Sequence, residues 1–241
     1  MQKIEPTSEL KLATHQLNQI RSQMKKAFIG RDREIDGLYT GLIARTHVLL
    51  LGPPGTAKSN ITQVFAKTLG GSYFQRLLTA FSTPDEVFGA YDLAALDAGR
   101  YERNVSRYMP EAKTAFLDEI FKANSAVLNS LLTILNEREF DNGAARMKCP
   151  LEICVGASNE YPEGKSLGAL YDRFTIRFWT DYLNTRAEKM RLLDCPDPSQ
   201  LVTLKLSAGE VLRLQNAVDA VVVPQQVKEM LLDIHDALAK E

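Results

Sequence analysis

The stretch Gly52-Pro-Pro-Gly-Thr-Ala-Lys58-Ser59 decides the fold class of this chain. It follows Val48-Leu-Leu-Leu51, a short apolar run typical of a buried parallel strand, and precedes helically spaced apolar residues from Ser59 to Leu69. A strand, a glycine-rich turn and a helix in that order form an anion site, because loop N–H groups and the helix N-terminus face the anion. The stretch therefore predicts a phosphate-binding loop on an α/β fold that holds a nucleoside triphosphate.

The residues of this loop match the pattern G-x-x-x-x-G-K-[ST] with one departure. Lys58 is expected to reach the β- and γ-phosphates, and the Ser59 hydroxyl to ligate Mg²⁺. The pattern has glycine directly before the lysine, whereas this chain has Ala57. The alternative is a proline–glycine turn followed by an ordinary helix with an exposed lysine, but the flanking strand and helix favour a nucleotide site. We expect the nucleotide to contact Pro54, Gly55, Thr56, Ala57, Lys58, Ser59 and Asn60.

The rest of the chain alternates between predicted strands and helices, which favours a parallel sheet covered by helices on both faces. Strands are predicted at 73–78, 114–117, 153–157 and 175–178, and helices at 9–27, 31–44 and 126–135, with a capping box starting a short helix at Thr83. Two hairpins are predicted, near 91–108 and 140–149.

The proline-rich segment 194–199 predicts a domain boundary. It separates an α/β nucleotide-binding core at 1–193 from a helical tail at 194–241. Within the tail, Ser207 begins a second capping box and Pro224 opens a last helix.

An apolar strand delivers two carboxylates, Asp118 and Glu119, at its carboxyl end. In open α/β sheets ligands bind at this edge. Asp118 is expected to hold Mg²⁺, directly or through water, and Glu119 to orient or deprotonate an attacking water. The alternative is two ordinary surface acids at a strand end, but the position of the pair downstream of a phosphate loop disfavours it.

Two further polar residues follow buried segments. Asn159 ends the predicted strand at 153–157 and could hydrogen-bond the γ-phosphate or the attacking water; the alternative is a turn residue beside Tyr161-Pro162. Arg173 lies where a helix gives way to a strand and could act on a second subunit's nucleotide. The alternative is a helix-end arginine that pairs with Asp172, and Arg177 is a weaker candidate.

Together these segments resemble the AAA+ ATPases, and among them the MoxR family, with RavA-like members most similar. The resemblance extends from about Phe28 onward, and Ala57 agrees with it because alanine commonly precedes the lysine in that family. It rests on Gly52–Ser59, Phe81–Gly89, Phe116–Ile120, Asn129–Arg138, Gly156–Asn159 and Leu170–Phe174.

The resemblance implies a three-layer α/β/α core with a parallel five-stranded sheet, the start of a small helical lid, and assembly into a ring, usually a hexamer. Asp118 and Glu119 would be the Walker B pair, Asn159 the sensor-1 residue and Arg173 an arginine finger. Ile29 and Gly30 would lie against the adenine of ATP. The two hairpins resemble insertions with which such proteins contact their clients.

The resemblance also bears on activity and partners. The family's lid continues into a helix that carries a second sensor arginine, and the sequence ends at Glu241 before such a segment. A nucleotide-gated scaffold with little hydrolysis is therefore an alternative to a ring-forming ATPase that remodels proteins. MoxR-type ATPases commonly work with proteins that bear a von Willebrand factor A domain, which makes such a protein the expected client.

The composition of the chain disfavours several other classes of function. The 29 basic and 30 acidic residues nearly cancel, which disfavours a DNA-directed motor. A phosphotransferase built on the same loop would need an acceptor pocket, for which no signature is present. The three cysteines lack metal-ligand spacing, no apolar stretch is long enough for a bilayer, and residues 1–6 lack the layout of a signal peptide. These features predict a reducing, cytoplasmic setting.

Overall fold

A five-stranded parallel sheet forms the centre of the molecule. The computed structural model describes residues 7–163 and 165–239, so residues 1–6, on which the expectation of no signal peptide rests, lie outside the described part, as does Glu241. The strands follow the order β2-β3-β6-β1-β7 and all neighbouring pairs are parallel, as predicted. Their bounds are β1 Val48–Leu51, β2 Tyr73–Leu77, β3 Thr114–Asp118, β6 Ile153–Ser158 and β7 Ile176–Trp179.

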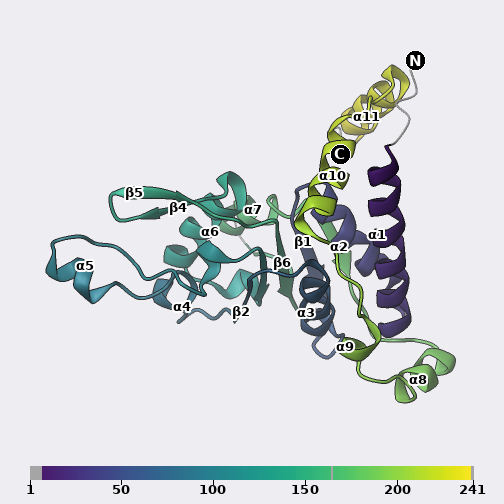
Figure 1. Ribbon diagram of the computed structural model, residues 1–241, viewed down its shortest axis with the longest axis horizontal. Coiled ribbons are helices and arrows are strands. Elements are labelled where there is room, and N and C mark those ends of the chain that lie inside the picture. The colour runs from purple at the N-terminus through teal and green to yellow at the C-terminus, as the bar shows by residue number, and fades with distance from the viewer. Residues whose placement is uncertain (1–6, 164, 240–241) are drawn as a thin grey trace.

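Helices cover both faces of this sheet (Figure 1). Along β1, Val48 and Leu50 pack into one core and Leu49 and Leu51 into the other, because successive strand side chains point to opposite faces. The first core contains α1 (Ser8–Ala27), α2 (Asp32–Ile43), α3 (Lys58–Leu69) and α10 (Ala208–Asp219). The second contains α4 (Pro84–Phe88), α6 (Ser125–Glu137) and α7 (Lys165–Tyr171). The predicted three-layer α/β/α architecture is confirmed.

The register of the strands brings the predicted polar residues to one edge. Leu51, the last residue of β1, pairs with Ser158 of β6, while Leu77 of β2 pairs with Asp118 of β3. The carboxyl ends of these four strands therefore lie at the same edge of the sheet, where ligands bind in open α/β folds.

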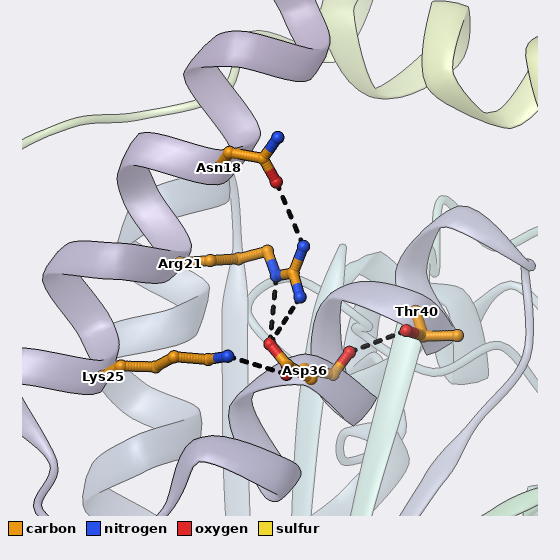
Figure 2. Close-up of polar contacts among 5 residues, drawn as sticks. All are labelled: Asn18, Arg21, Lys25, Asp36 and Thr40. Carbon is orange, nitrogen blue, oxygen red and sulfur yellow. Dashed lines mark hydrogen bonds and ion pairs between the residues drawn. The ribbon is translucent and has the colours of Figure 1, made fainter.

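A charged cluster joins α1 to α2 (Figure 2). Arg21 donates from Nε and Nη2 to Asp36 Oδ1 at 3.1 and 2.6 Å, and Lys25 Nζ donates to Asp36 Oδ2 at 2.7 Å. Partial burial pushes the pKa of Asp36 up, but the hydrogen bonds from Lys25 and Arg21 outweigh it and hold that pKa below its ordinary value. The cluster fixes α1 over the first core.

The segment near 91–108, predicted as a hairpin, is a short antiparallel pairing with a helix at its tip: Asp92 N donates to Glu102 O and Asn104 N to Ala90 O, both at 2.8 Å. This segment contains the short helix α5 (Leu93–Asp97) and a single antiparallel bridge between Tyr91 and Arg103. Asp92 starts the helix by accepting from Ala95 N at 3.1 Å. The Asn142 side chain binds both Arg103 N (2.6 Å) and Arg103 O (3.1 Å), so an amide takes the place of a strand partner.

The second predicted hairpin is confirmed, with β4 (Glu139–Asn142) antiparallel to β5 (Ala145–Lys148). It projects on the same side as α5, away from α1 (Figure 1). The short 3₁₀ helices η1 (Met109–Glu111) and η2 (Ile120–Lys122) flank β3. The helix at Thr83 also forms, as α4, but Thr83 makes no side-chain cap bond and its hydroxyl contacts Glu86 Oε1 at 3.5 Å instead.

Within the described residues, four helices follow β7: α8 (Arg186–Leu193), α9 (Pro198–Leu201), α10 and α11 (Gln225–Leu238). The Ser207 capping box is confirmed, and α11 follows Pro224 as predicted. Val211 and Leu214 of α10 are buried with α1 and α2, whereas α11 has no buried residue. The division of the chain at residue 194 stays a prediction. Over the ranges 7–163 and 165–239, no helix has both the length and the apolarity to cross a bilayer.

A buried histidine precedes β1. His47 Nδ1 accepts from Cys154 N at 3.0 Å, which assigns the ring proton to Nε2, 2.9 Å from Leu135 O. Burial, and then the nearby Arg138 cation, lower the pKa of His47 to about 3. The folded chain therefore holds the neutral ring.

We expect His47 to make the chain sensitive to mild acid. The unfolded ring takes up a proton near pH 6.5 whereas the folded one does not, so this contribution is present above pH 6.5 and is lost as pH falls toward 3. The free energy of unfolding should drop by about 2 kcal/mol between pH 7.5 and 5 from this group. His47→Gln, which can keep both hydrogen bonds, should remove most of that slope in urea titrations. His15→Gln, at an exposed site, should leave it; an unchanged slope in the His47 variant would contradict the assignment.

Candidate functional site

The phosphate loop takes its shape from three backbone positions. Gly52 directly follows β1 and packs against Thr180, the residue after β7. A Cβ on Gly52 would lie 2.1 Å from the carbonyl oxygen of Thr180. Gly55 has φ +77° with open space around it, so glycine serves the backbone conformation there. Ala57 precedes the first residue of α3 with φ +70°, in the left-handed region. The loop thus ends at Ala57, where the general pattern has glycine, and Ala57 has a backbone conformation that glycine adopts more easily.

We expect Ala57→Gly to stabilise the chain modestly. A non-glycine residue in the left-handed region costs roughly 1 kcal/mol, which glycine avoids, although part of this gain is offset by the freer unfolded chain. A rise in the melting temperature of a few degrees, measured by calorimetry, would agree with this balance. A lower melting temperature would show that the methyl group makes a contact that outweighs the strain.

Lys58 is buried at the start of α3, with 6% of its surface exposed. Its Nζ donates to the loop carbonyls Gly52 O (2.6 Å) and Pro53 O (2.8 Å), and to Asn159 Oδ1 (3.3 Å). Burial, with a smaller effect from the Arg31 cation, lowers the pKa of Lys58, and the two carboxylates at 118 and 119 oppose the shift. The ammonium group therefore lies between the loop and the neighbouring strand end.

The acidic pair lies at the end of β3. Asp118 Oδ1 accepts from Glu119 N at 3.1 Å, and Glu119 itself has φ +51°, an uncommon conformation for this residue type. Burial raises the pKa of Asp118, and the negative charge of Glu119 adds to the shift. The turn at Glu119 aims the two side chains into one cavity, described below.

Asn159 connects the lysine to the second carboxylate. Its Nδ2 donates to Glu119 Oε1 at 2.5 Å, while its Oδ1 accepts from Lys58. Glu119 Oε2 is buried and makes an ion pair with Lys122 Nζ at 3.3 Å, without the geometry of a hydrogen bond to any residue that the structure describes. One oxygen of Glu119 is thus fixed by the amide, and the other is buried beside the Lys122 ammonium group.

Two cavities meet at the phosphate loop. The first, called the loop cavity here, has a volume of about 340 Å³ and brings together the lysine, both carboxylates and the amide. The second, called the side cavity, has a volume of about 380 Å³ and is largely apolar. Gly55, Thr56, Ala57 and Asn60 line both, so the cavities are contiguous along the loop. The loop cavity is also lined by Pro54, Lys58, Ser59, Leu77, Asp118, Glu119 and Asn159.

The structure places the two residues expected to lie against the adenine in different cavities. Ile29 lines the side cavity with Ala27 and Phe28, whereas Gly30 does not. Gly30 faces a third cavity of about 500 Å³, and a Cβ on it would lie 2.6 Å from Leu183 Cδ2. Gly30 is needed there for the close approach of Leu183, which does line the side cavity.

The donor atoms in the loop cavity fit a magnesium ion bound together with phosphate. Ser59 and Asp118 both line it, and hydroxyl and carboxylate oxygens are ligands that Mg²⁺ accepts. Ser59 makes no side-chain hydrogen bond to another described residue, so its oxygen is open to a ligand. Over residues 7–163 and 165–239 no group of three or more His, Cys, Asp or Glu could hold a metal alone. A metal here would therefore depend on phosphate oxygens for its remaining ligands.

Arg173 lies outside both cavities and is exposed. It makes no ion pair with any residue in the described part of the chain, and Asp172 pairs with Arg177 (3.7 Å) instead. The Arg177 guanidinium lies 3.7 Å from the centre of the Tyr171 ring and donates to Phe174 O at 2.7 Å. Of the two candidate arginines, only Arg173 is thus free of local partners among the described residues.

Two parts of the site carry no prediction from the sequence. Lys122 pairs with Glu119, and its spacing of three residues from a predicted acid would have been a usable signal. The second wall of the side cavity comes from the segment after β7, including Tyr182, Leu183 and Leu192. No motif marks these residues, because ordinary apolar side chains become a cavity wall only through packing.

Comparison with known proteins now decides the family. The profile described as "MoxR domain in the MoxR-vWA-beta-propeller ternary systems" matches residues 15–195. The chain belongs to the MoxR family of AAA+ ATPases. The predicted resemblance to the MoxR family is thus confirmed.

Individual MoxR relatives agree with this assignment. An uncharacterised protein of Methanocaldococcus jannaschii is 38% identical over 93% of this chain and 60% of its own length. The chaperone MoxR1 of Mycobacterium tuberculosis is 27% identical over 83% of this chain and 54% of its own length. The chain therefore spans between half and two thirds of these relatives. A structure of a candidate ATPase from Cytophaga hutchinsonii shares the fold, with a TM-score of 0.75, 20% identity, and coverage of 93% of this chain and 69% of that one.

Proposed function

We propose that this chain binds ATP with Mg²⁺ and hydrolyses it within a homo-oligomeric ring, a hexamer, to remodel a protein partner. The observation that carries the proposal is the convergence of Lys58, Asn159 and Glu119 on the loop cavity through two hydrogen bonds. A cation that binds phosphate, an amide and a carboxylate are the groups that phosphoryl transfer to water uses.

In this proposal the triphosphate occupies the loop cavity and the base occupies the side cavity. Lys58 exchanges its carbonyl contacts for phosphate oxygens, and loop N–H groups bind the remaining oxygens. Ser59 and Asp118 would hold the ion, which would supply positive charge to stabilise the negative charge that develops in phosphoryl transfer. Glu119 accepts a proton from a water molecule while the oxygen of that water attacks the γ-phosphorus. The bond between the γ-phosphorus and the bridging oxygen breaks, and ADP leaves with the electron pair of that bond.

Arg173 is the reason for proposing a ring. A cation that stabilises the transition state has to approach the γ-phosphate, and none of the residues lining the loop cavity is an arginine. Arg173 is exposed and lies outside that cavity. If each subunit placed its Arg173 beside the nucleotide of the neighbouring subunit, every site would be complete. Repetition of this one contact around a rotation axis closes a ring.

The partner we propose is a protein with a von Willebrand factor A domain. The support is the description of the matched family, which places MoxR domains in systems with such a domain and a β-propeller. A purified protein of that kind is expected to comigrate with the Glu119→Gln variant in ATP during size-exclusion chromatography, and to separate from it without nucleotide. Separation under both conditions would remove this partner from the proposal.

The central experiment measures phosphate release and molar mass together. Specific activity should rise more than linearly with protein concentration, and light scattering on the Glu119→Gln variant should show a hexamer with ATP and smaller species without it. Constant specific activity with a monomer in ATP would reject the ring. Assembly in ATP without any phosphate release by the unmodified chain would instead favour the nucleotide-gated scaffold, and transfer of labelled phosphate to a metabolite would favour the phosphotransferase.

A further inference from the structure

The side cavity has two walls from distant parts of the sequence. One is formed by Ala27, Phe28 and Ile29, directly before α2, and the other by Tyr182 and Leu183 of the 180–185 linker that joins β7 to α8. The linker has no regular secondary structure. Its first residue, Thr180, donates from N to Leu51 O at 2.6 Å, but residues 181–184 make no backbone–backbone hydrogen bond to another described residue. Its position beside the first wall therefore depends on side-chain contacts.

Arg31 supplies the contact between the two walls. Its Nη2 donates to Asp181 O of the linker at 2.6 Å, and its Nη1 donates to Gly30 O at 3.4 Å. The residue is 8% exposed, and its guanidinium lies 3.9 Å from the buried carboxylate of Glu34. A buried arginine with a charge partner and carbonyl acceptors is held in one orientation, because each lost contact leaves a polar group unsatisfied.

Gly30 also brings the two walls together, because its lack of a side chain leaves room for Leu183 of the linker. It has φ +69°, and the space where a Cβ would be is filled to within 2.6 Å by Leu183 Cδ2. Leu183 can therefore pack directly on the backbone of the first wall. The hydrogen bond to Asp181 O and the packing of Leu183 fix the linker at two points, two residues apart.

We infer that Arg31 is a positioning residue for the nucleotide base: it ties the 180–185 linker to the turn before α2 and so holds the side cavity in the shape that receives the base. This inference rests on the proposed nucleotide site. On this inference, the affinity for a nucleotide has two separate contributions, one from the phosphates and one from the base. Phosphate binding depends on the loop and Lys58, which line the loop cavity. Base binding depends on the side cavity, which Arg31 also lines and whose two walls it joins.

A calorimetric comparison of two ligands tests the separation. ADP uses both cavities, while inorganic pyrophosphate uses only the loop cavity. We expect Arg31→Met to weaken ADP binding about tenfold and to leave pyrophosphate affinity within about twofold, since one well-made buried hydrogen bond is worth roughly that ratio. Arg31→Lys should recover part of the loss, because an ammonium group can still donate to Asp181 O.

The matched control is Arg33→Met. Arg33 lines the third cavity and neither of the two nucleotide cavities, so both affinities should stay unchanged. Arg31→Met also removes the charge partner of Glu34 and could unfold the chain. Leu183→Ala then serves as the second variant, because it removes wall contact without touching the ion pair and should show the same selective loss of ADP.

Each outcome decides the inference. An equal loss of ADP and pyrophosphate affinity would show that Arg31 acts on phosphate, and unchanged ADP affinity in both the Arg31 and Leu183 variants would show that the linker contact is irrelevant; either result overturns it. If the unmodified chain binds neither ligand, the nucleotide site and the inference fall together. If it binds ADP with the predicted split but releases no phosphate from ATP, the proposed hydrolysis fails and the positioning role stands.

Discussion

Arg173→Ala is expected to lower kcat for ATP hydrolysis by about 10³–10⁵, the range found for arginines supplied to a phosphoryl-transfer site from a second subunit. Nucleotide binding should be nearly unchanged, because Arg173 lines neither cavity of its own chain. The stability of the fold should also be retained, since Arg173 is exposed and has no ion-pair partner in the described ranges. Steady-state phosphate release and calorimetric binding to a non-hydrolysable analogue measure the two effects separately.

Mixing two inactive variants shows whether Arg173 acts between subunits. Lys58→Met removes phosphate binding but keeps Arg173, whereas Arg173→Ala keeps the phosphate loop. In mixed rings, some Arg173→Ala subunits receive the arginine of a Lys58→Met neighbour, so activity should reappear on mixing. A mixture as inactive as its components, at concentrations where mixed assemblies are detected, would reject the trans role.

Arg177→Ala is the control for the arginine side chain itself. Arg177 lies over the Tyr171 ring and donates to two backbone carbonyls, so its loss should affect stability more than turnover. A drop in kcat with Arg177→Ala as large as that with Arg173→Ala would point to a general disturbance of the surface around α7.

Glu119→Gln should lower kcat by about 10²–10⁴ while ATP binding is retained. Glutamine keeps an oxygen that can accept from Asn159 Nδ2, so the contact at 2.5 Å and the position of Lys58 can persist. What it lacks is the capacity to take a proton from water. Single-turnover measurement of phosphate release, beside the dissociation constant for ATP, distinguishes loss of chemistry from loss of binding.

The same substitution at the other end of the sheet is the control. Glu152 lies before β6 and pairs with Lys113 before β3, at the amino ends of these strands. Glu152→Gln should leave kcat unchanged. Retained turnover in Glu119→Gln would remove Glu119 from the role of proton acceptor, and weakened ATP binding would show that its charge instead organises the cavity.

The sequence predicted the layered fold because its decisive signals are local. The apolar run Val48–Leu51, the glycine turn and the helix after Lys58 are each legible within a few residues, and the predicted parallel order of strands follows from their alternation with helices. Where a prediction depended on a distant partner, it was less accurate. The segment near 91–108, expected to be a hairpin, pairs antiparallel at Tyr91 and Arg103 but has the helix α5 at its tip, and Asn142, far along the chain, binds the backbone of Arg103.

Placement of the predicted site residues shows the same division. Lys58, Asp118, Glu119 and Asn159 were singled out from strand ends, and parallel strands bring their carboxyl ends to one edge whatever the side chains between them. The sequence did not indicate that Gly30 packs against Leu183, since the identity of this neighbour depends on how the 180–185 linker packs.

The sequence by itself determined that a phosphate loop, an acidic strand end and a polar amide follow one another on an α/β chain of the MoxR type. It could do so because backbone geometry and residue chemistry at each of these places are fixed by immediate neighbours. Only the tertiary structure decided which of Arg173 and Arg177 is free, and what forms the second wall of the side cavity. The contact that holds this wall joins Arg31 to Asp181 across 150 residues, and a contact of that span exists only once the core has packed.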